Sequence, residues 1–183
     1  MKVLKIVLIV VGALIALPLI IALFLNKDFF CEREVTINQD KNKVFEYIKF
    51  LKNQDQYSYW ASLDPNMKKE YRGTDGTVGF VSAWESPHEN VGKGEQEIKK
   101  ITEGSRVDYE LRFIEPYEDT NQAYMTTESV GNGQTKVKWG IVGRMDYPMN
   151  LMTLFMDMEA MVGKDLEIGL KNLKKKMEQP PQS

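Results

Sequence analysis

Residues 106–113 read RVDYELRF and lie at the centre of the stretch that decides the fold. Val107, Tyr109 and Leu111 alternate with charged residues, and Phe113 continues the series. Successive side chains of a β-strand point to opposite faces, so this period of two predicts a strand with one buried face. The charged residues between them are expected on the solvent face.

Strand patterns flank this stretch on both sides, and no helical pattern interrupts them. The six predicted strands cover residues 68–72, 78–84, 94–101, 106–113, 123–129 and 135–143. Turn residues separate them, most clearly GTDG at 73–76, EGS at 103–105 and GNG at 131–133. Strands joined directly by short turns pair antiparallel, and such sheets usually bury one face. The sequence therefore predicts an antiparallel meander.

Helical patterns precede and follow this meander. After a predicted strand at residues 32–37, an apolar stripe predicts a helix that runs to residue 53, and a short helical turn covers residues 55–60. The last helix is predicted from Pro148, a favourable first helical position, to Glu178.

Two glycines lie inside this last predicted helix. Gly163 and Gly169 each cost up to about 1 kcal/mol relative to alanine in a helix interior. The helix also carries a continuous apolar stripe that must face the sheet. We therefore expect the backbone to pack closely against the sheet at both glycines.

Residues 6–25 read IVLIVVGALIALPLIIALFL and carry no charge. Twenty residues of helix span roughly 30 Å, which is the thickness of the hydrocarbon core of a bilayer. A cleaved signal peptide is the alternative, but its apolar region normally has about 7 to 15 residues and ends in a small-residue cleavage site. We favour an uncleaved transmembrane anchor that contacts the membrane through residues 6–25.

The anchor divides the chain into three predicted parts. They are the anchor at 1–30, the soluble domain at 31–179 and a short tail at 180–183. Lys2 and Lys5 precede the apolar run, and the positive-inside rule then places the N-terminus in the cytoplasm. The expected localisation is a single-pass protein of the cell membrane with its domain on the extracytoplasmic side.

The composition excludes several classes of function. The net charge is −2, and without Lys2 and Lys5 the rest of the chain has 22 basic against 26 acidic residues. Nucleic-acid binding needs a basic face, so no nucleic-acid partner is expected. The single cysteine, Cys31, and the single histidine, His88, exclude an internal disulfide, a zinc site and a cysteine–histidine nucleophile pair.

In addition to the order of the predicted elements, several local motifs resemble those of a known protein family. The motifs are VFEYI at 44–48 with Trp60, GTVGF at 76–80 through Trp84, VGKGE at 91–95, FIEP at 113–116, TKVKW at 135–139 and MVGKDLEIGL at 161–170. As a set they resemble the polyketide cyclase/dehydrase branch of the START-like superfamily, also called SRPBCC. The resemblance implies an α+β helix-grip fold, in which a curved antiparallel sheet of about seven strands wraps a long C-terminal helix.

The resemblance also implies an internal apolar cavity, which different members use for lipids, sterols or polyketide-like molecules. The predicted lining is Phe80, Trp84, Tyr109, Leu111, Phe113, Trp139, Met152, Phe155, Met156 and Met158. Flexible methionine side chains adapt to ligands of varied apolar shape. The leading interpretation is non-catalytic binding of a lipid or other hydrophobic small molecule, with no cofactor and no metal.

Two alternatives stay open. One is a cyclase or dehydratase, in which inward polar groups such as Arg33 or Tyr109 do acid–base work. The other is a protein-binding module whose groove holds a peptide of another membrane protein. Glu95 and Glu97 are expected on the outer face of their strand and His88 in a solvated loop, so these residues are weak catalytic candidates.

Overall fold

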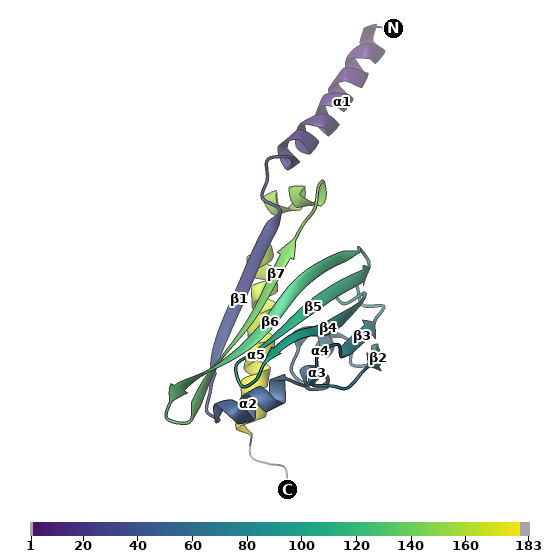
Figure 1. The fold of residues 1–183 in the computed structure, drawn as a ribbon. Coiled ribbons are helices and arrows are strands. Elements are labelled where there is room, and N and C mark those ends of the chain that lie inside the picture. The colour runs from purple at the N-terminus through teal and green to yellow at the C-terminus, as the bar shows by residue number, and fades with distance from the viewer. Residues whose placement is uncertain (1, 180–183) are drawn as a thin grey trace.

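A curved seven-stranded sheet folds round a long helix in the computed structural model, which describes residues 2–179 (Figure 1). The strands are β1 (Asp28–Ile37), β2 (Lys68–Arg72), β3 (Val81–Glu85), β4 (Lys93–Thr102), β5 (Arg106–Glu115), β6 (Asp119–Gly131) and β7 (Gln134–Arg144). Their order across the sheet is β1-β7-β6-β5-β4-β3-β2, and each neighbouring pair is antiparallel. The predicted helix-grip architecture is confirmed. The predicted tail, residues 180–183, lies outside the described residues.

The strands follow the predicted alternation, and small differences in their bounds have local causes. Val107 and Tyr109 are buried on the concave face of β5, as expected. β3 begins at Val81, later than predicted, because the chain turns at Gly79. The φ of Gly79 is 88°, a conformation that residues with a side chain rarely adopt.

Three short helices occupy the predicted helical region after β1. They are α2 (Lys41–Ile48), α3 (Leu51–Gln54) and α4 (Tyr59–Leu63). The Asp40 side chain caps α2 by accepting a hydrogen bond from the Asn42 N–H at 2.9 Å. The carboxylate of Asp75 accepts from the N–H groups of Leu51 at 2.8 Å and Lys52 at 3.2 Å. This distant residue therefore starts a new helix where the local pattern predicted a continuous one.

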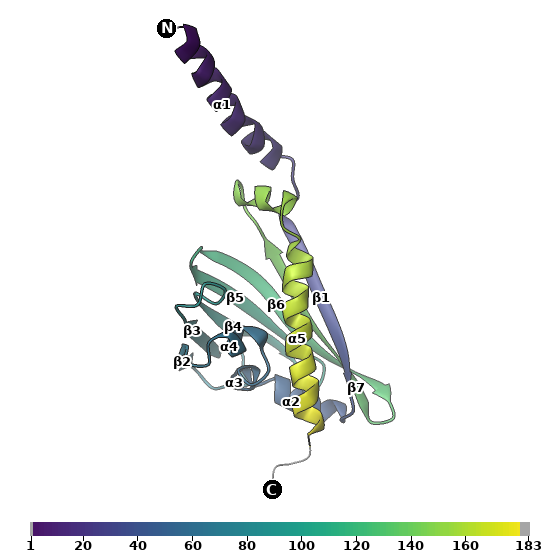
Figure 2. The ribbon, with the colours of Figure 1, turned by 180° about the vertical axis from the view of Figure 1, so that it is seen from behind.

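The last helix is shorter than predicted. α5 covers Met158–Glu178, and the residues after Pro148 form a 3-10 turn, η1 (Met149–Leu154), and a bend. The predicted start at Pro148 is therefore wrong. Asp157 sets the true start, because its side chain accepts a hydrogen bond from the Ala160 N–H at 2.9 Å. α5 then runs along the concave side of the sheet, beside β1 (Figure 2).

The two glycines of α5 mark its close approaches to the sheet. A Cβ added at Gly169 would lie 2.8 Å from Cζ3 of Trp139. A Cβ added at Gly163 would meet the guanidinium of Arg33. The close packing expected at both glycines is therefore present. The neighbour at Gly169 is the ring of a buried tryptophan, whereas the neighbour at Gly163 is the end of a long, flexible side chain.

We expect Gly169→Ala to lower the free energy of unfolding by about 1–2 kcal/mol. The buried Trp139 ring cannot move aside, so overpacking outweighs the gain in helix propensity. Gly163→Ala is the matched control, because the end of the Arg33 side chain can swing into solvent and the net change should stay within about 1 kcal/mol of zero. Urea unfolding of the full chain in detergent micelles measures both variants. Equal destabilisation by the two changes would contradict the packing assigned to Trp139.

The outer face of the sheet carries a charged cluster centred on Arg112. Its guanidinium donates to Glu95 and Glu97 at 2.7 Å each and also contacts Glu110. Glu95 and Glu97 thus face away from α5, as expected. Hydrogen bonds from Arg72 and Arg112 hold the pKa of Glu95 below its ordinary value, and the bond from Arg112 does the same for Glu97.

We expect Arg112→Met to lower the free energy of unfolding by about 1–3 kcal/mol at pH 7, because three carboxylates then lack their shared cation. A lowered carboxylate pKa stabilises the folded state above the ordinary pKa, and this stabilisation is lost as the pH falls through the lowered value. The variant no longer has that contribution, so its deficit should shrink as the pH falls towards about 4.

Urea unfolding at pH 7 and pH 4 measures this deficit. Lys99→Met is the control, since Lys99 contacts the same cluster at Glu97 and Glu110 but is more exposed than Arg112. Its expected effect is below about 0.5 kcal/mol. A deficit of Arg112→Met that grows on acidification would contradict the role given to the ion pairs.

The first helix, α1 (Lys2–Ala22), projects away from the sheet (Figures 1 and 2). It is long and apolar enough to cross a membrane, and its apolar window has no buried residue. A signal sequence near the N-terminus meets the same criteria. Only Ala22, at the end of α1, is buried against the rest of the protein.

Candidate ligand-binding cavity

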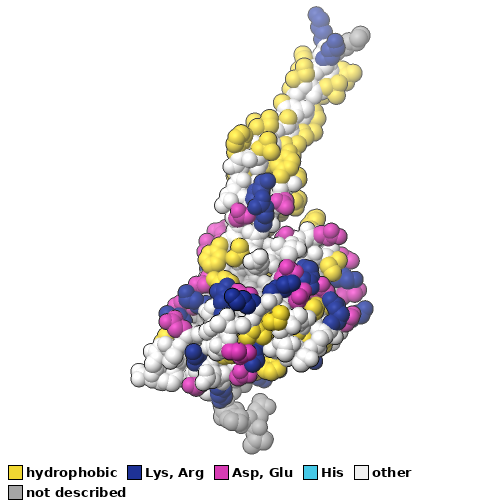
Figure 3. Space-filling view, viewed as in Figure 1, with side chains coloured by type: hydrophobic (Ala, Val, Ile, Leu, Met, Phe, Trp, Pro, Cys, Tyr) yellow, Lys and Arg dark blue, Asp and Glu magenta, His cyan; other side chains and the backbone are white. Residues whose placement is uncertain are grey.

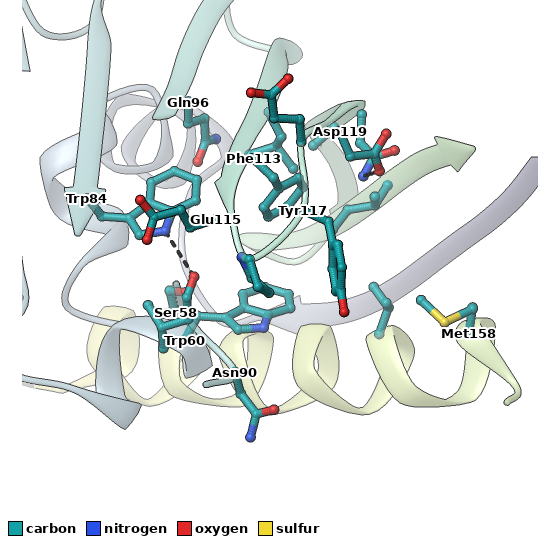
Figure 4. Close-up of a pocket in the computed structure, with 18 of the residues that line it drawn as sticks. Ser58, Trp60, Trp84, Asn90, Gln96, Phe113, Glu115, Tyr117, Asp119 and Met158 are labelled. Atoms are coloured by element: carbon teal, nitrogen blue, oxygen red, sulfur yellow. Dashed lines mark hydrogen bonds between the residues drawn. The ribbon is translucent and has the colours of Figure 1, made fainter. Parts of the chain in front are cut away.

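A cavity of about 570 Å³ lies between the concave face of the sheet and the helices α4 and α5 (Figure 4). Its volume falls within the range of small-molecule sites, which is about 300–1,000 Å³. Strands β3 to β7 all contribute to its wall. The apolar lining includes Phe29, Leu51, Trp60, Trp84, Leu111, Phe113, Ala123, Trp139, Ile141, Met158 and Val162.

All three tryptophans of the chain, Trp60, Trp84 and Trp139, line this cavity. Trp139 is 2% exposed, and its ring makes edge-on contacts with Tyr57 and Trp60, at centroid distances of 5.8 and 6.2 Å. Trp84 packs edge-on against Phe113 at 6.1 Å. Edge-to-face pairs are a favourable arrangement of aromatic rings, so these contacts stabilise the cavity wall.

Besides Asn121, which donates a hydrogen bond to Asp119, three buried polar side chains line the cavity: Ser58, Ser82 and Gln96. None of them forms a side-chain hydrogen bond within residues 2–179, yet none has a polar atom fully sealed from solvent. A buried polar group left without a partner costs about 1–3 kcal/mol. These groups are therefore available to a ligand or to water inside the cavity.

An ion pair occupies another part of the lining. Lys69 Nζ lies 2.7 Å from Asp55 Oδ1, and the Tyr71 hydroxyl donates to Asp55 Oδ2 at 2.8 Å. Burial and this hydrogen bond raise the pKa of Tyr71 above its ordinary value, so the hydroxyl keeps its proton. Both oxygens of Asp55 already accept hydrogen bonds, which makes this carboxylate a poor general base.

The cavity lining includes residues 89–91, 115–119 and 144–147, so it extends to the end of the sheet from which α1 projects (Figures 1 and 2). Three connections form its rim, at residues 86–92, 116–118 and 144–147. The first is held to the sheet by Trp84, whose Nε1 donates to the Val91 carbonyl at 3.2 Å. We take this end of the cavity, close to the base of α1, as its mouth.

The lining carries an excess of negative charge. Its carboxylates are Asp55, Glu89, Glu115, Glu118, Asp119 and Asp146, and its cations are Lys69 and Arg144. Arg144 pairs with Asp146 at 3.0 Å, as Lys69 does with Asp55. Four carboxylates thus remain without a cation in the lining. Glu89 and Glu118 belong to the rim, and Glu115 and Asp119 end the strands on either side of its second connection, so the mouth is acidic while the interior is apolar.

The fold brings five of the ten predicted lining residues together in this cavity. They are Trp84, Leu111, Phe113, Trp139 and Met158. Four of them come from three strands, and Met158 begins α5. These strand positions share the inward parity on which the prediction was based.

The other five predicted lining residues lie outside the cavity. Phe80 and Tyr109 have the inward parity but are buried in the core and do not line the cavity. Met152, Phe155 and Met156 belong to η1 and to the bend before α5, where the predicted helix is broken. They therefore do not face the sheet as a continuous helix would have placed them.

Sequence reasoning missed several lining residues, among them Trp60, Gln96 and Ile141. Gln96 left a detectable signal, because it is a polar residue at an inward position between Gly94 and Ile98. Trp60 left none, since it belongs to the short helix α4, which reaches the cavity only through the tertiary fold.

The two residues considered for acid–base work do not reach the cavity. Arg33 faces α5, as its parity predicted, but forms ion pairs with Glu159 at 3.4 Å and Glu167 at 3.3 Å. Tyr109 is fully buried, and its hydroxyl donates to the Ile48 carbonyl at 3.4 Å. Burial also raises the pKa of Tyr109, which keeps the hydroxyl neutral.

Cys31 and His88 have structural contacts. The thiol of Cys31 is buried and donates to the Glu159 carbonyl at 3.5 Å, and burial raises its pKa. Nδ1 of His88 accepts from the Asn90 N–H at 3.2 Å. Within residues 2–179, no group of three or more histidine, cysteine or acidic side chains could hold a metal ion.

No family model and no curated protein matches this sequence, but solved structures match its fold. A truncated norcoclaurine synthase from Thalictrum flavum matches with a TM-score of 0.62 at 10% identity, over 85% of this chain and 96% of that chain. The Aha1 dimer from Colwellia psychrerythraea gives 0.58 at 15% identity, over 84% and 99%. Ara h 8.0201 gives 0.56 at 17% identity, over 82% and 97%. The chain has the Bet v1/START-like helix-grip fold.

Proposed function

We propose that this protein is a membrane-anchored binding protein that holds a lipid or other hydrophobic small molecule without covalent chemistry. The observation that carries the proposal is the cavity of about 570 Å³, walled by all three tryptophans. An apolar cavity with a few convergent polar groups is the usual composition of a small-molecule site. Ser58, Ser82 and Gln96 supply those polar groups, and the START-like resemblance supports a hydrophobic ligand.

The contact between α1 and the folded part of the chain supports an anchor that stays attached. The Nδ2 group of Asn150 donates to the Ala22 carbonyl at 2.6 Å, and Ala22 is buried. Removing a signal sequence would leave this buried amide without its partner, at a cost of about 1–3 kcal/mol. Lys2 and Lys5 favour a cytoplasmic N-terminus and therefore an extracytoplasmic domain.

The enzyme alternative, a cyclase or dehydratase, retains one candidate group, the pair of Asp55 and Lys69 in the cavity lining. The hydrogen bonds to both oxygens of Asp55 favour a binding function instead. A peptide-binding module is the other alternative. It would give no lipid binding in the experiment below, because a bound peptide would exclude a single-chain lipid from the cavity.

Intrinsic fluorescence tests lipid binding, because every tryptophan lines the cavity. The full chain in detergent micelles is titrated with a single-chain phosphocholine lipid that carries bromine on its acyl chain. We expect saturable quenching of more than half the emission, which excess unbrominated lipid reverses. Absent quenching, or quenching that rises linearly without saturation, would overturn the proposal.

We expect the cavity to prefer zwitterionic over anionic ligands of equal chain length. The excess of carboxylates at the mouth repels an anionic headgroup, so a brominated fatty-acid anion should bind about three- to ten-fold more weakly than the phosphocholine lipid at low salt. Raising the salt concentration shortens the Debye length and should reduce this preference. Tighter binding of the anion at low salt would contradict the charge assigned to the rim.

A further inference from the structure

The η1 turn and the residue after it expose an apolar surface at the base of α1. Met149, Met152, Leu154 and Phe155 have exposed fractions of 42, 38, 51 and 84%. Single exposed apolar residues are ordinary, but a contiguous set of large ones marks an interaction surface. Within residues 2–179 this surface is not covered by any other segment.

Asn150 holds η1 against the end of α1. It is fully buried, and its Nδ2 donates to the Ala22 carbonyl at 2.6 Å and to the Leu25 carbonyl at 3.4 Å. The last carbonyls of a helix have no partner inside that helix, so Asn150 satisfies the Ala22 carbonyl at the end of α1. The position of η1 along the axis of α1 is therefore fixed.

That position coincides with the end of the apolar run at Leu25. Charged residues begin directly below it, and Arg144 pairs there with Asp28 at 3.2 Å and Asp146 at 3.0 Å. Figure 3 shows this change, with apolar side chains over α1 down to its base and charged side chains beyond it. A spanning helix of this length reaches the headgroup level at the same point.

We propose that η1 inserts into the interfacial layer of the lipid bilayer, with Leu154 and Phe155 in contact with the acyl chains. This inference rests on the proposed anchoring by α1. The bilayer is the occupant because the exposed surface of η1 continues the apolar surface of α1 and is bounded by the charged residues below it. Apolar side chains backed by a charged layer are typical of segments that lie in a membrane interface.

Insertion of η1 places the cavity mouth against the membrane. Tyr147, just before η1, and Met149, its first residue, both line the cavity. A lipid that leaves the bilayer beside η1 therefore meets the apolar interior without crossing bulk water. The anchor then does more than localise the domain, because it holds the entrance at the lipid surface.

Fluorescence quenching in nanodiscs tests the depth of η1. The full-length Phe155→Cys variant is labelled with an environment-sensitive maleimide dye, and the buried thiol of Cys31 does not compete. The nanodiscs contain phosphatidylcholine with bromine on the acyl carbons near the headgroup. Val130→Cys is the matched control, since Val130 is also an exposed apolar residue but lies on β6, next to the β6–β7 turn.

We expect brominated lipid to quench the label at position 155 at least two-fold relative to unbrominated lipid, with no change at position 130. Leu154→Cys provides a second labelling site, in case the change at Phe155 itself disturbs the local structure. If the labels at positions 154 and 155 both stay unquenched in protein that remains in the nanodisc, insertion is overturned while anchoring stands. Loss of the protein from the nanodisc would overturn the anchoring and this inference with it.

Discussion

Replacing Trp139 by alanine is expected to lower the free energy of unfolding by about 3–5 kcal/mol. The ring is 2% exposed, touches Tyr57 and Trp60, and lies against α5 at Gly169. It therefore connects three elements that are distant in the sequence. Its removal leaves a void that the neighbouring residues fill only in part, and the cost of such a void adds to the lost burial of the ring.

Trp84→Ala is the matched control for this prediction. Both tryptophans line the cavity, but Trp84 is only half-buried, so its truncation removes less buried area and should cost about 1–2 kcal/mol. Urea unfolding of both variants in detergent micelles measures the difference. If Trp139→Ala were as stable as Trp84→Ala, Trp139 could not be the contact that joins α5 to the sheet.

The Ala123→Phe variant is expected to weaken binding of the brominated phosphocholine lipid more than ten-fold. Ala123 is 3% exposed and lines the cavity from the middle of β6. A phenyl ring at this position projects into the space that a ligand needs. The effect follows from volume alone, because the change alters neither the charge nor the apolar character of the wall.

Gln122→Phe places the same ring on the outer face of the same strand and is the control for Ala123→Phe. Ser82→Phe blocks the cavity from β3 and serves as a second variant if Ala123→Phe folds poorly. Circular dichroism verifies the fold of each variant. If both blocking variants fold and bind the lipid as tightly as the wild type, the ligand binds at a site outside the cavity.

The sheet could be predicted from the sequence because the alternating pattern that specifies each strand lies within the strand itself. Alternation in β5 specifies both the strand and its buried face, so Val107 and Tyr109 lie where expected. The start of α5 could not be predicted in this way. The residues of η1 continue the apolar pattern, but periodicity shows only which residues are apolar and not what covers them. Here the exposed side of η1 faces away from the sheet.

The cavity was only partly predictable for a related reason. Strand parity identifies inward residues, and it therefore found Leu111 and Trp139. Parity does not distinguish the cavity from the packed core, so it also selected Phe80 and Tyr109. That distinction depends on the curvature of the sheet and on the placement of α4 and α5, which are properties of the whole fold.

Native mass spectrometry of the full chain tests the central claim most directly. The protein is extracted from its membrane in a mild detergent that is released in the gas phase, and any bound molecule is identified after solvent extraction. We predict one hydrophobic species at close to one copy per chain in the wild type, and its loss in the Ala123→Phe variant. A wild-type chain found only at its unbound mass, or equal occupancy in both proteins, would contradict ligand binding in the cavity.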